Sequence, residues 1–246
     1  MRHAALVAEL EACIGDNAVR VVLLSAPRGS GVSSALASFA EEIRGWGHRA
    51  DVVDAERVGV QPGGAVDALL RARLGLSAAV KGNQLLEALD SAAPGLEPLA
   101  REFLAFAMGC SRDDFQTARL DVKSRWEGAL AEVGRWLTAL DGTWAWVIDD
   151  AVAVDDETLL LVERLARGAA TPGLVVLTVR DDERQIFEPR IKAIRASGRV
   201  RELPLPSLTP EALKLAFPST ASAARGVLLT AKLLELNGRE GGLPTT

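Results

Sequence analysis

The residues best suited to chemistry lie in a glycine-rich stretch near the N-terminus. Residues 26–33 read Ala-Pro-Arg-Gly-Ser-Gly-Val-Ser, after the apolar run at 21–24 and before a helical pattern of apolar residues. A phosphate-binding loop follows the pattern G-x-x-x-x-G-K-[ST], in which backbone N–H groups of the loop and the N-terminus of the next helix hold the phosphates. The spacing is present here, but Ala26 occupies the first glycine position and Val32 the lysine position. The stretch therefore predicts a phosphate cradle without its principal cation.

The loop supplies most of the candidate ligands for a nucleotide. Gly29 and Gly31 let the backbone approach a phosphate closely, and the hydroxyl of Ser33 is a candidate ligand for Mg²⁺. The full set of candidate cofactor-binding residues in the loop is Arg28, Gly29, Ser30, Gly31, Val32, Ser33 and Ser34. An ordinary strand-to-helix turn of an α/β protein is the alternative, because the missing lysine is the most informative residue of the pattern.

A pair of carboxylates follows a second apolar run. Residues 144–148 read Trp-Ala-Trp-Val-Ile, and Asp149 and Asp150 come directly after them, which is the Walker B pattern. A buried strand would place these carboxylates at the C-terminal edge of a sheet, where open α/β sheets bind ligands. Asp149 would then hold Mg²⁺ through water, and Asp150 would polarise the attacking water as the catalytic residue of an active enzyme. An apolar run followed by two aspartates also occurs widely in proteins without such a site.

A third candidate is Arg180, which ends the apolar run at 174–179. An arginine at that position can face the terminal phosphate of a nucleotide and report its presence to a lid. The alternative is a solvated arginine at the start of a loop, since Asp181, Asp182 and Glu183 follow directly.

These residues need a sheet that brings their strands together. Short apolar runs bounded by turn signals predict strands at 21–24, 51–55, 144–148, 174–179 and 200–205. Apolar residues at helical spacing predict helices at 4–13, 33–45, 121–140, 156–168, 209–216 and 222–236, with mostly helical structure throughout 62–140. Alternation of buried strands with helices indicates a parallel sheet covered on both faces.

Composition limits the classes of function. The chain has 246 residues, of which 48% are hydrophobic and 25% charged, and its net charge of −5 argues against a general nucleic-acid binder. Cys13 and Cys110 are far apart in the sequence, so we expect reduced, buried thiols in a cytoplasmic protein. His3 and His48 are equally isolated, which argues against a zinc or iron site. No apolar run approaches the ~18 residues that span a bilayer, and no secretion signal precedes the first helix.

Taken together, three segments resemble the ATPase domain of the STAND class, which comprises signal-transduction P-loop ATPases related to AAA+. Residues 146–162 are similar to the extended Walker B block of that class, and residues 173–183 are similar to its sensor strand, which ends in Thr-x-Arg. Residues 202–213 resemble the start of its helical lid. The resemblance is greatest to the bacterial form found beside kinase, cyclase or DNA-binding regulatory domains.

The resemblance implies an α/β fold: a P-loop NTPase-like parallel sheet sandwiched by helices, with a small C-terminal helical lid. The implied domains are 1–205, with a helical insertion at about 62–140, a lid segment at 206–236 and a flexible tail at 237–246. The implied cofactor is ATP or ADP with Mg²⁺, held by Ser33 and Asp149. Implied partners are proteins or fused effector and sensor domains, with a nucleotide-dependent oligomer, and neither a membrane nor nucleic acid.

Departures from the family pattern concentrate at the active site. Besides Ala26 and Val32, residues 152–153 replace a His-Trp pair, and residues 226–228 correspond to a glycine-x-proline element without its proline. Losing a charge-assisted hydrogen bond of roughly 1.5–3 kcal/mol weakens binding by about 10- to 150-fold. Hydrolysis depends further on the lysine, because charge develops on the transferring phosphoryl group.

Three functions are compatible with this pattern. The leading hypothesis is a degenerate STAND/AAA-type nucleotide-binding regulatory module with weak or absent ATP hydrolysis, acting as a signalling switch or a protein-interaction scaffold. The alternative is an active ATPase in which Arg28 replaces the lysine. A third hypothesis is an assembly domain whose pocket is empty or filled by side chains. Whether the chain is an enzyme is left open by its sequence.

Overall fold

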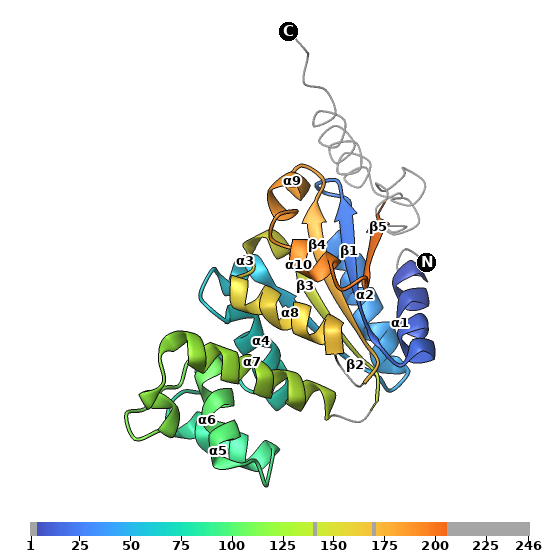
Figure 1. Cartoon of the computed structure of the whole chain (residues 1–246). Helices are drawn as coiled ribbons and strands as arrows, with labels where there is room; N and C mark the ends of the chain where they lie inside the picture. The colour runs from blue at the N-terminus through green and yellow to red at the C-terminus, as the bar shows by residue number, and fades with distance from the viewer. Residues whose placement is uncertain (1–3, 140–141, 169–170, 206–246) are drawn as a thin grey trace, which may run out of the picture.

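A computed structural model describes residues 4–139, 142–168 and 171–205, and its sheet is parallel throughout (Figure 1). The strands are β1 Val19–Ala26, β2 Arg49–Asp54, β3 Trp144–Asp149, β4 Gly173–Arg180 and β5 Val200–Pro204. Their order in the sheet is β2-β3-β4-β1-β5. The expected α/β class, with a parallel sheet between helical layers, is confirmed. The lid and tail expected at 206–236 and 237–246 lie outside the described residues, and the domain division remains a prediction.

Both faces of the sheet are buried, which explains why the strands are continuous apolar runs. Side chains alternate along β1: Val21 and Leu23 enter one hydrophobic cluster, and Val22 and Leu24 enter the other. The first cluster lies under α4, α7 and α8, and the second lies under α1 and α2. The bounds of these helices are α1 Ala4–Asp16, α2 Val32–Gly45, α4 Gly64–Leu74, α7 Val122–Thr138 and α8 Asp156–Gly168.

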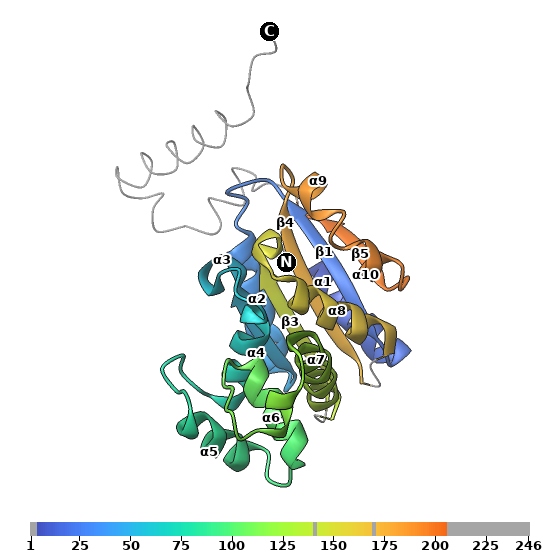
Figure 2. The same ribbon diagram turned by 60° about the vertical axis from the view of Figure 1, so that its left-hand side comes forward.

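The chain between β2 and β3 is largely helical. After the short α3 (Ala55–Val58) and α4, it forms α5 (Asn83–Ala92), α6 (Pro98–Ala107), the 3₁₀ turn η1 (Gln116–Arg119) and α7. Figures 1 and 2 both show α5 and α6 at the end of the molecule away from the tips of β1 and β4. The helix expected at 121–140 starts one residue later, because Asp121 is its N-cap and accepts a 2.9 Å hydrogen bond from the N–H of Ser124.

Short elements complete the described chain. They are the 3₁₀ turn η2 (Ala151–Ala153) after β3, and α9 (Arg184–Phe187) and α10 (Lys192–Arg195) between β4 and β5. Both cysteines are free and buried, as expected, and burial raises the pKa of Cys13 to about 11. Within the described ranges, we find no helix with the length and apolarity needed to cross a bilayer.

The strand order determines which sequence segments meet. Because β3, β4 and β1 are neighbours and run in the same direction, their C-terminal ends share one edge of the sheet. In this register Ala26 of β1 is opposite Arg180 of β4, and Ile148 of β3 is opposite Leu177. The loop after β1, the aspartates after β3 and the arginine at the end of β4 therefore gather at one place.

Candidate functional site

The loop after β1 has the backbone of a phosphate cradle. Gly29 and Gly31 both adopt left-handed conformations, with φ of 72° and 76°, which glycine accepts without strain. The N–H of Ser30 donates a 3.2 Å hydrogen bond to the carbonyl of Pro27, which tightens the turn. Gly31 is the N-cap of α2 and provides no side-chain acceptor for the first N–H groups of that helix. These N–H groups are the hydrogen-bond donors that bind an anion in such a loop, and the dipole of the helix adds to the attraction.

Ser33 and Asp149, the two predicted magnesium ligands, are in direct contact. The hydroxyl of Ser33, in the first turn of α2, donates a 2.6 Å hydrogen bond to Oδ2 of Asp149 at the end of β3. The other carboxylate oxygen, Oδ1, accepts a 2.6 Å hydrogen bond from the hydroxyl of Thr178 on β4. Two fixed oxygens thus lie beside the loop. Hydroxyl and carboxylate oxygens are the hard ligands that Mg²⁺ prefers.

Asp150 is held in an unusual backbone conformation. Its φ and ψ of 54° and 51° are left-handed, which is uncommon for a residue with a side chain. Its N–H donates a 2.9 Å hydrogen bond to the hydroxyl of Thr178, so the 4%-exposed Thr178 orients both aspartates. Burial raises the pKa of Asp150, and the carboxylates of Asp149 and Glu56 add to this, while Arg180 opposes the shift.

Arg180 pairs with three carboxylates. Its Nη2 lies 2.9 Å from Oε1 of Glu56 and 3.1 Å from Oδ1 of Asp150, and its Nη1 lies 3.4 Å from Oε1 of Glu183. Burial alone would lower the pKa of Arg180, but the carboxylates of Asp150, Glu183 and Glu56 outweigh it and raise the pKa above its usual value. The guanidinium therefore faces the cleft with its charge largely balanced.

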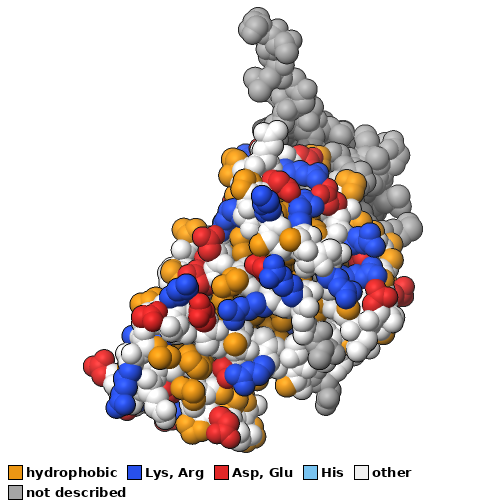
Figure 3. Space-filling model, in the orientation of Figure 1, with side chains coloured by type: hydrophobic (Ala, Val, Ile, Leu, Met, Phe, Trp, Pro, Cys, Tyr) orange, Lys and Arg blue, Asp and Glu red, His pale blue; other side chains and the backbone are white. Residues whose placement is uncertain are grey.

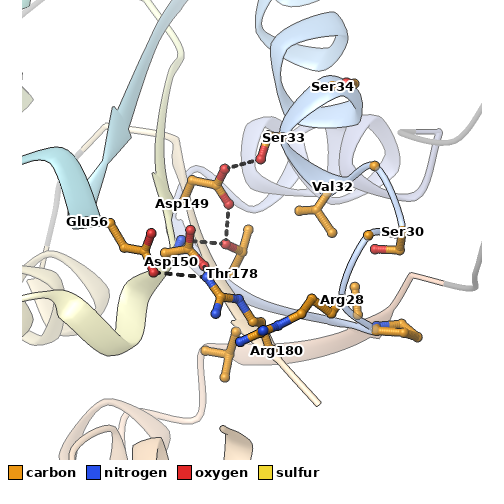
Figure 4. A pocket seen from close by; sticks show the side chains of 15 residues that line it. Arg28, Ser30, Val32, Ser33, Ser34, Glu56, Asp149, Asp150, Thr178 and Arg180 are labelled. Atoms are coloured by element: carbon orange, nitrogen blue, oxygen red, sulfur yellow. Dashed lines mark hydrogen bonds and ion pairs between the residues drawn. The ribbon is translucent and has the colours of Figure 1, made fainter. Parts of the chain in front are cut away.

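Val32 occupies the lysine position of the loop, and Arg28 is the candidate to replace that lysine; their surroundings differ. Val32 is half-buried and packs against the hydrophobic cluster beneath α1 and α2. Figure 4 shows its side chain at the start of α2, between the loop and Thr178. Arg28 is exposed, and within the part of the chain that the structure describes it forms no hydrogen bond or ion pair. Val32 therefore adds an apolar surface to the cradle, whereas Arg28 is a cation without a fixed partner among the described residues.

All the predicted site residues line one cleft with a volume of about 730 Å³ (Figure 4). From the loop these are Arg28, Gly29, Ser30, Gly31, Val32, Ser33 and Ser34, and from the neighbouring strands Asp149, Asp150 and Arg180. The structure thus brings together residues that are up to about 150 positions apart in the sequence.

Sequence reasoning missed two residues of the cleft. Thr178 was seen only as part of the sensor strand, although its hydroxyl contacts Asp149 and Asp150. Glu56, in α3, was not considered at all. A signal for Glu56 was present, since it follows the predicted strand at 51–55 just as the aspartates follow the predicted strand at 144–148. Parallel strands end at the same edge, so an acidic residue after β2 belongs near the aspartates.

Basic residues near the C-terminal end of the described chain are engaged in internal contacts. Arg190 donates 2.9 Å and 2.8 Å hydrogen bonds to the carbonyl of Val152 and the carboxylate of Asp156. Arg195 pairs with Glu188 and Glu202. Lys and Arg side chains share the visible surface with Asp and Glu (Figure 3). Arg190 and Arg195 therefore connect neighbouring segments of the chain.

A magnesium nucleotide fits part of this site. The left-handed glycines, the uncapped start of α2 and the paired oxygens of Ser33 and Asp149 supply a backbone cradle and a place for Mg²⁺. The position that would carry a lysine is apolar, so a phosphate in this cradle would be held by backbone dipoles and by the cation that accompanies the ligand. These groups are suited to binding a magnesium nucleotide, and they are less suited to stabilising the transition state of its hydrolysis.

Comparisons with known proteins add a distant likeness to solved structures of ORC and Cdc6 proteins. A scan against protein-family models finds no match, and a search of curated proteins finds none. Among solved structures, Drosophila ORC bound to poly(dA/dT) DNA and Cdc6 matches with 12% identity and a TM-score of 0.49, over 87% of this chain and 30% of that chain. The Aeropyrum pernix ORC1 protein in complex with DNA matches with 17% identity and a TM-score of 0.46, over 87% and 47%. Cdc6p from Pyrobaculum aerophilum matches with 14% identity and a TM-score of 0.47, over 87% and 48%.

This chain spans less than half the length of those three proteins. At such identities and TM-scores the likeness carries no argument about ligands or partners. The fold rests on this chain's own strand order and on the strand–loop–helix unit at residues 19–45.

Proposed function

We propose that this chain is a nucleotide-binding regulatory module of the STAND/AAA type, in which phosphate binding is retained and ATP hydrolysis is weak or absent. The observation that carries the proposal is the contact between Ser33 and Asp149 beside a glycine loop that has valine at the lysine position. The groups that would bind a magnesium nucleotide line the same cleft. The group that most strongly stabilises the transition state is missing.

Each described side chain has a defined part in this proposal. Ser33 and Asp149 would hold Mg²⁺, which supplies charge neutralisation for the phosphates when bound. Thr178 orients Asp149 and the backbone of Asp150. Arg180 would contact the terminal phosphate and register its presence. Val32 leaves the loop without a fixed positive charge, so binding energy is not converted into stabilisation of the transferring phosphoryl group.

An active ATPase remains the second candidate, and one observation favours it. Arg28 lines the cleft, is exposed and is free of carboxylate partners within the described residues. Its guanidinium is thus available to a phosphate, and an arginine binds phosphate through two parallel hydrogen bonds. If Arg28 replaces the lysine, Arg28→Ala abolishes nucleotide binding. Unchanged binding by Arg28→Ala would exclude that role.

Calorimetric titration tests the main proposal. The purified protein, freed of carried-over nucleotide, is titrated with Mg·ATP and with Mg·ADP. We expect dissociation constants in the micromolar to sub-millimolar range. We also expect an ATP turnover that Asp150→Asn leaves unchanged, because background hydrolysis does not use that carboxylate. Turnover at a rate typical of active ATPases, abolished by Asp150→Asn, would show a working enzyme. Absence of binding at millimolar nucleotide would favour a pure assembly domain.

Partners belong to the proposal as well. A module of this type acts on fused or separate effector and sensor domains, and nucleotide occupancy would alter its self-association. Light scattering of the protein with and without Mg·ATP tests whether nucleotide alters self-association. The net charge of −5 argues against a nucleic-acid partner. Fluorescence anisotropy with labelled duplex DNA tests that expectation directly, and salt-dependent binding would overturn it.

A further inference from the structure

The guanidinium of Arg180 is shared by carboxylates from three segments of the chain. Glu56 belongs to α3, Asp150 follows β3, and Glu183 follows β4. A guanidinium has five N–H donors in a fixed plane; here Nη2 donates to both Glu56 and Asp150, and Nη1 donates to Glu183. A phosphate oxygen that binds Nη2 of Arg180 must therefore compete with the carboxylates of Glu56 and Asp150.

The three carboxylates are not held equally. Asp150 is anchored through its N–H on Thr178, and Glu183 lies three residues from Arg180 on the same segment. Glu56 comes from the other side of Asp150 (Figure 4), and its side chain is 58% exposed. In the described ranges it makes no other hydrogen bond or ion pair. Glu56 is therefore the partner that can leave Arg180 at the lowest cost.

We infer that Glu56 is a built-in competitor that occupies Arg180 when the cleft holds no nucleotide and is displaced when a terminal phosphate binds. This inference rests on the nucleotide-binding function proposed above and specifies how the same site is restrained. Removing the carboxylate of Glu56 should therefore tighten binding.

Displacement of Glu56 has a structural consequence beyond the cleft. Glu56 lies in α3, a four-residue helix that connects β2 to α4 and the helical segment beyond it. The Arg180–Glu56 ion pair ties this helix to the end of β4. A phosphate on Arg180 removes that tie, so occupancy of the cleft would change how α3 is held.

The test is a double-mutant cycle on Glu56 and Arg180, read as the dissociation constant of the magnesium complex of the β,γ-imido analogue of ATP. Exposed ion pairs are worth about 0.2–1 kcal/mol, so Glu56→Gln should tighten binding by about 1.4- to 5-fold. In an Arg180→Gln background the same substitution should leave the dissociation constant unchanged. Glu11→Gln is the matched control, because this substitution removes the same charge at another place. Glu11 is an exposed glutamate of α1 without a partner among the described residues.

The outcomes separate this inference from the proposed function. If the wild-type protein binds and Glu56→Gln does not tighten binding, the competitor role is wrong and the proposed function stands. If Glu56→Gln tightens binding equally with and without Arg180, the effect is a general charge effect, and the competitor role is again wrong. Binding by Glu56→Gln alone, with none by the wild-type protein, would support the competitor role. Failure of both proteins to bind would overturn both proposals.

Discussion

Ser33 and Asp149 are 116 residues apart in the sequence, and their side chains are joined by a 2.6 Å hydrogen bond. This contact exists because α2 begins directly after the loop at residues 27–31 that follows β1, while β3 ends at the same sheet edge two strands away. The hydroxyl and the carboxylate are thereby fixed before any ligand arrives. Preorganised ligands lower the entropic cost of binding a cation.

Ser33→Ala should weaken binding of Mg·ATP by about tenfold or more, because a hydrogen bond to a charged group contributes roughly 1.5–3 kcal/mol. Binding of ATP in the presence of EDTA should not change, since the hydroxyl acts through the cation. Paired titrations with and without Mg²⁺ measure the difference. An equal loss in both titrations would show that Ser33 contacts phosphate directly or supports the loop.

Val32→Lys should strengthen binding of Mg·ATP by about 10- to 150-fold, because it restores a charge-assisted hydrogen bond to phosphate. The lysine stem can cover the apolar cluster that Val32 contacts, while its ammonium reaches the cleft. Val32→Met serves as the uncharged control of comparable length. No gain over Val32→Met, with both variants folded, would mean that the loop does not bind phosphate as its backbone indicates.

Thr178→Val should destabilise the fold by about 1–3 kcal/mol, because the substitution removes the hydrogen-bond partner of two polar groups that are shielded from water. Thr178 is 4% exposed, and its hydroxyl satisfies Oδ1 of Asp149 and the N–H of Asp150. Thr178→Ser keeps the hydroxyl and should retain most of the stability. Urea unfolding of the three proteins measures this. Valine keeps the methyl group of threonine and serine lacks it, so a loss confined to Thr178→Ser would trace the stability to packing of that methyl group and would contradict the prediction.

Much of the fold could be predicted because the strands are buried on both faces. The runs at 21–24, 144–148 and 174–179 contain few polar residues, and each lies within a strand of the structure. The edge strand β2 was less well placed: it begins at Arg49, and Ala55 already belongs to α3. Only its inner edge pairs with another described strand, so its apolar pattern is weaker.

The site was predictable as a set of segments and not as a set of contacts. Spacing after strands placed Asp149, Asp150 and Arg180 at one edge of the sheet. The same spacing could not show that the guanidinium of Arg180 is already paired with the carboxylate of Glu56, because Glu56 lies 124 residues earlier in the sequence. Periodicity reports which face of an element is buried. It does not report which charged side chains meet across a cleft.

The raised pKa of Asp150 predicts how stability depends on pH. Burial raises this pKa first, Asp149 and Glu56 add to it, and Arg180 only partly opposes the shift. Folding therefore favours the protonated carboxyl over the carboxylate. The contribution of Asp150 to stability is fully present below its unfolded-state pKa and is lost as the pH rises through the raised folded-state pKa.

Asp150→Asn removes that loss, since asparagine stays neutral at every pH. The variant should therefore have a larger free energy of unfolding than the wild-type protein at pH 7. The difference should shrink as the pH falls through the raised pKa of Asp150 and disappear below it, where both side chains are uncharged. Urea unfolding from pH 7 to pH 3.5 provides the measurement, with Glu11→Asn as the exposed control. A less stable variant at pH 7 would show that the ion pair with Arg180 outweighs the cost of burying the Asp150 carboxylate.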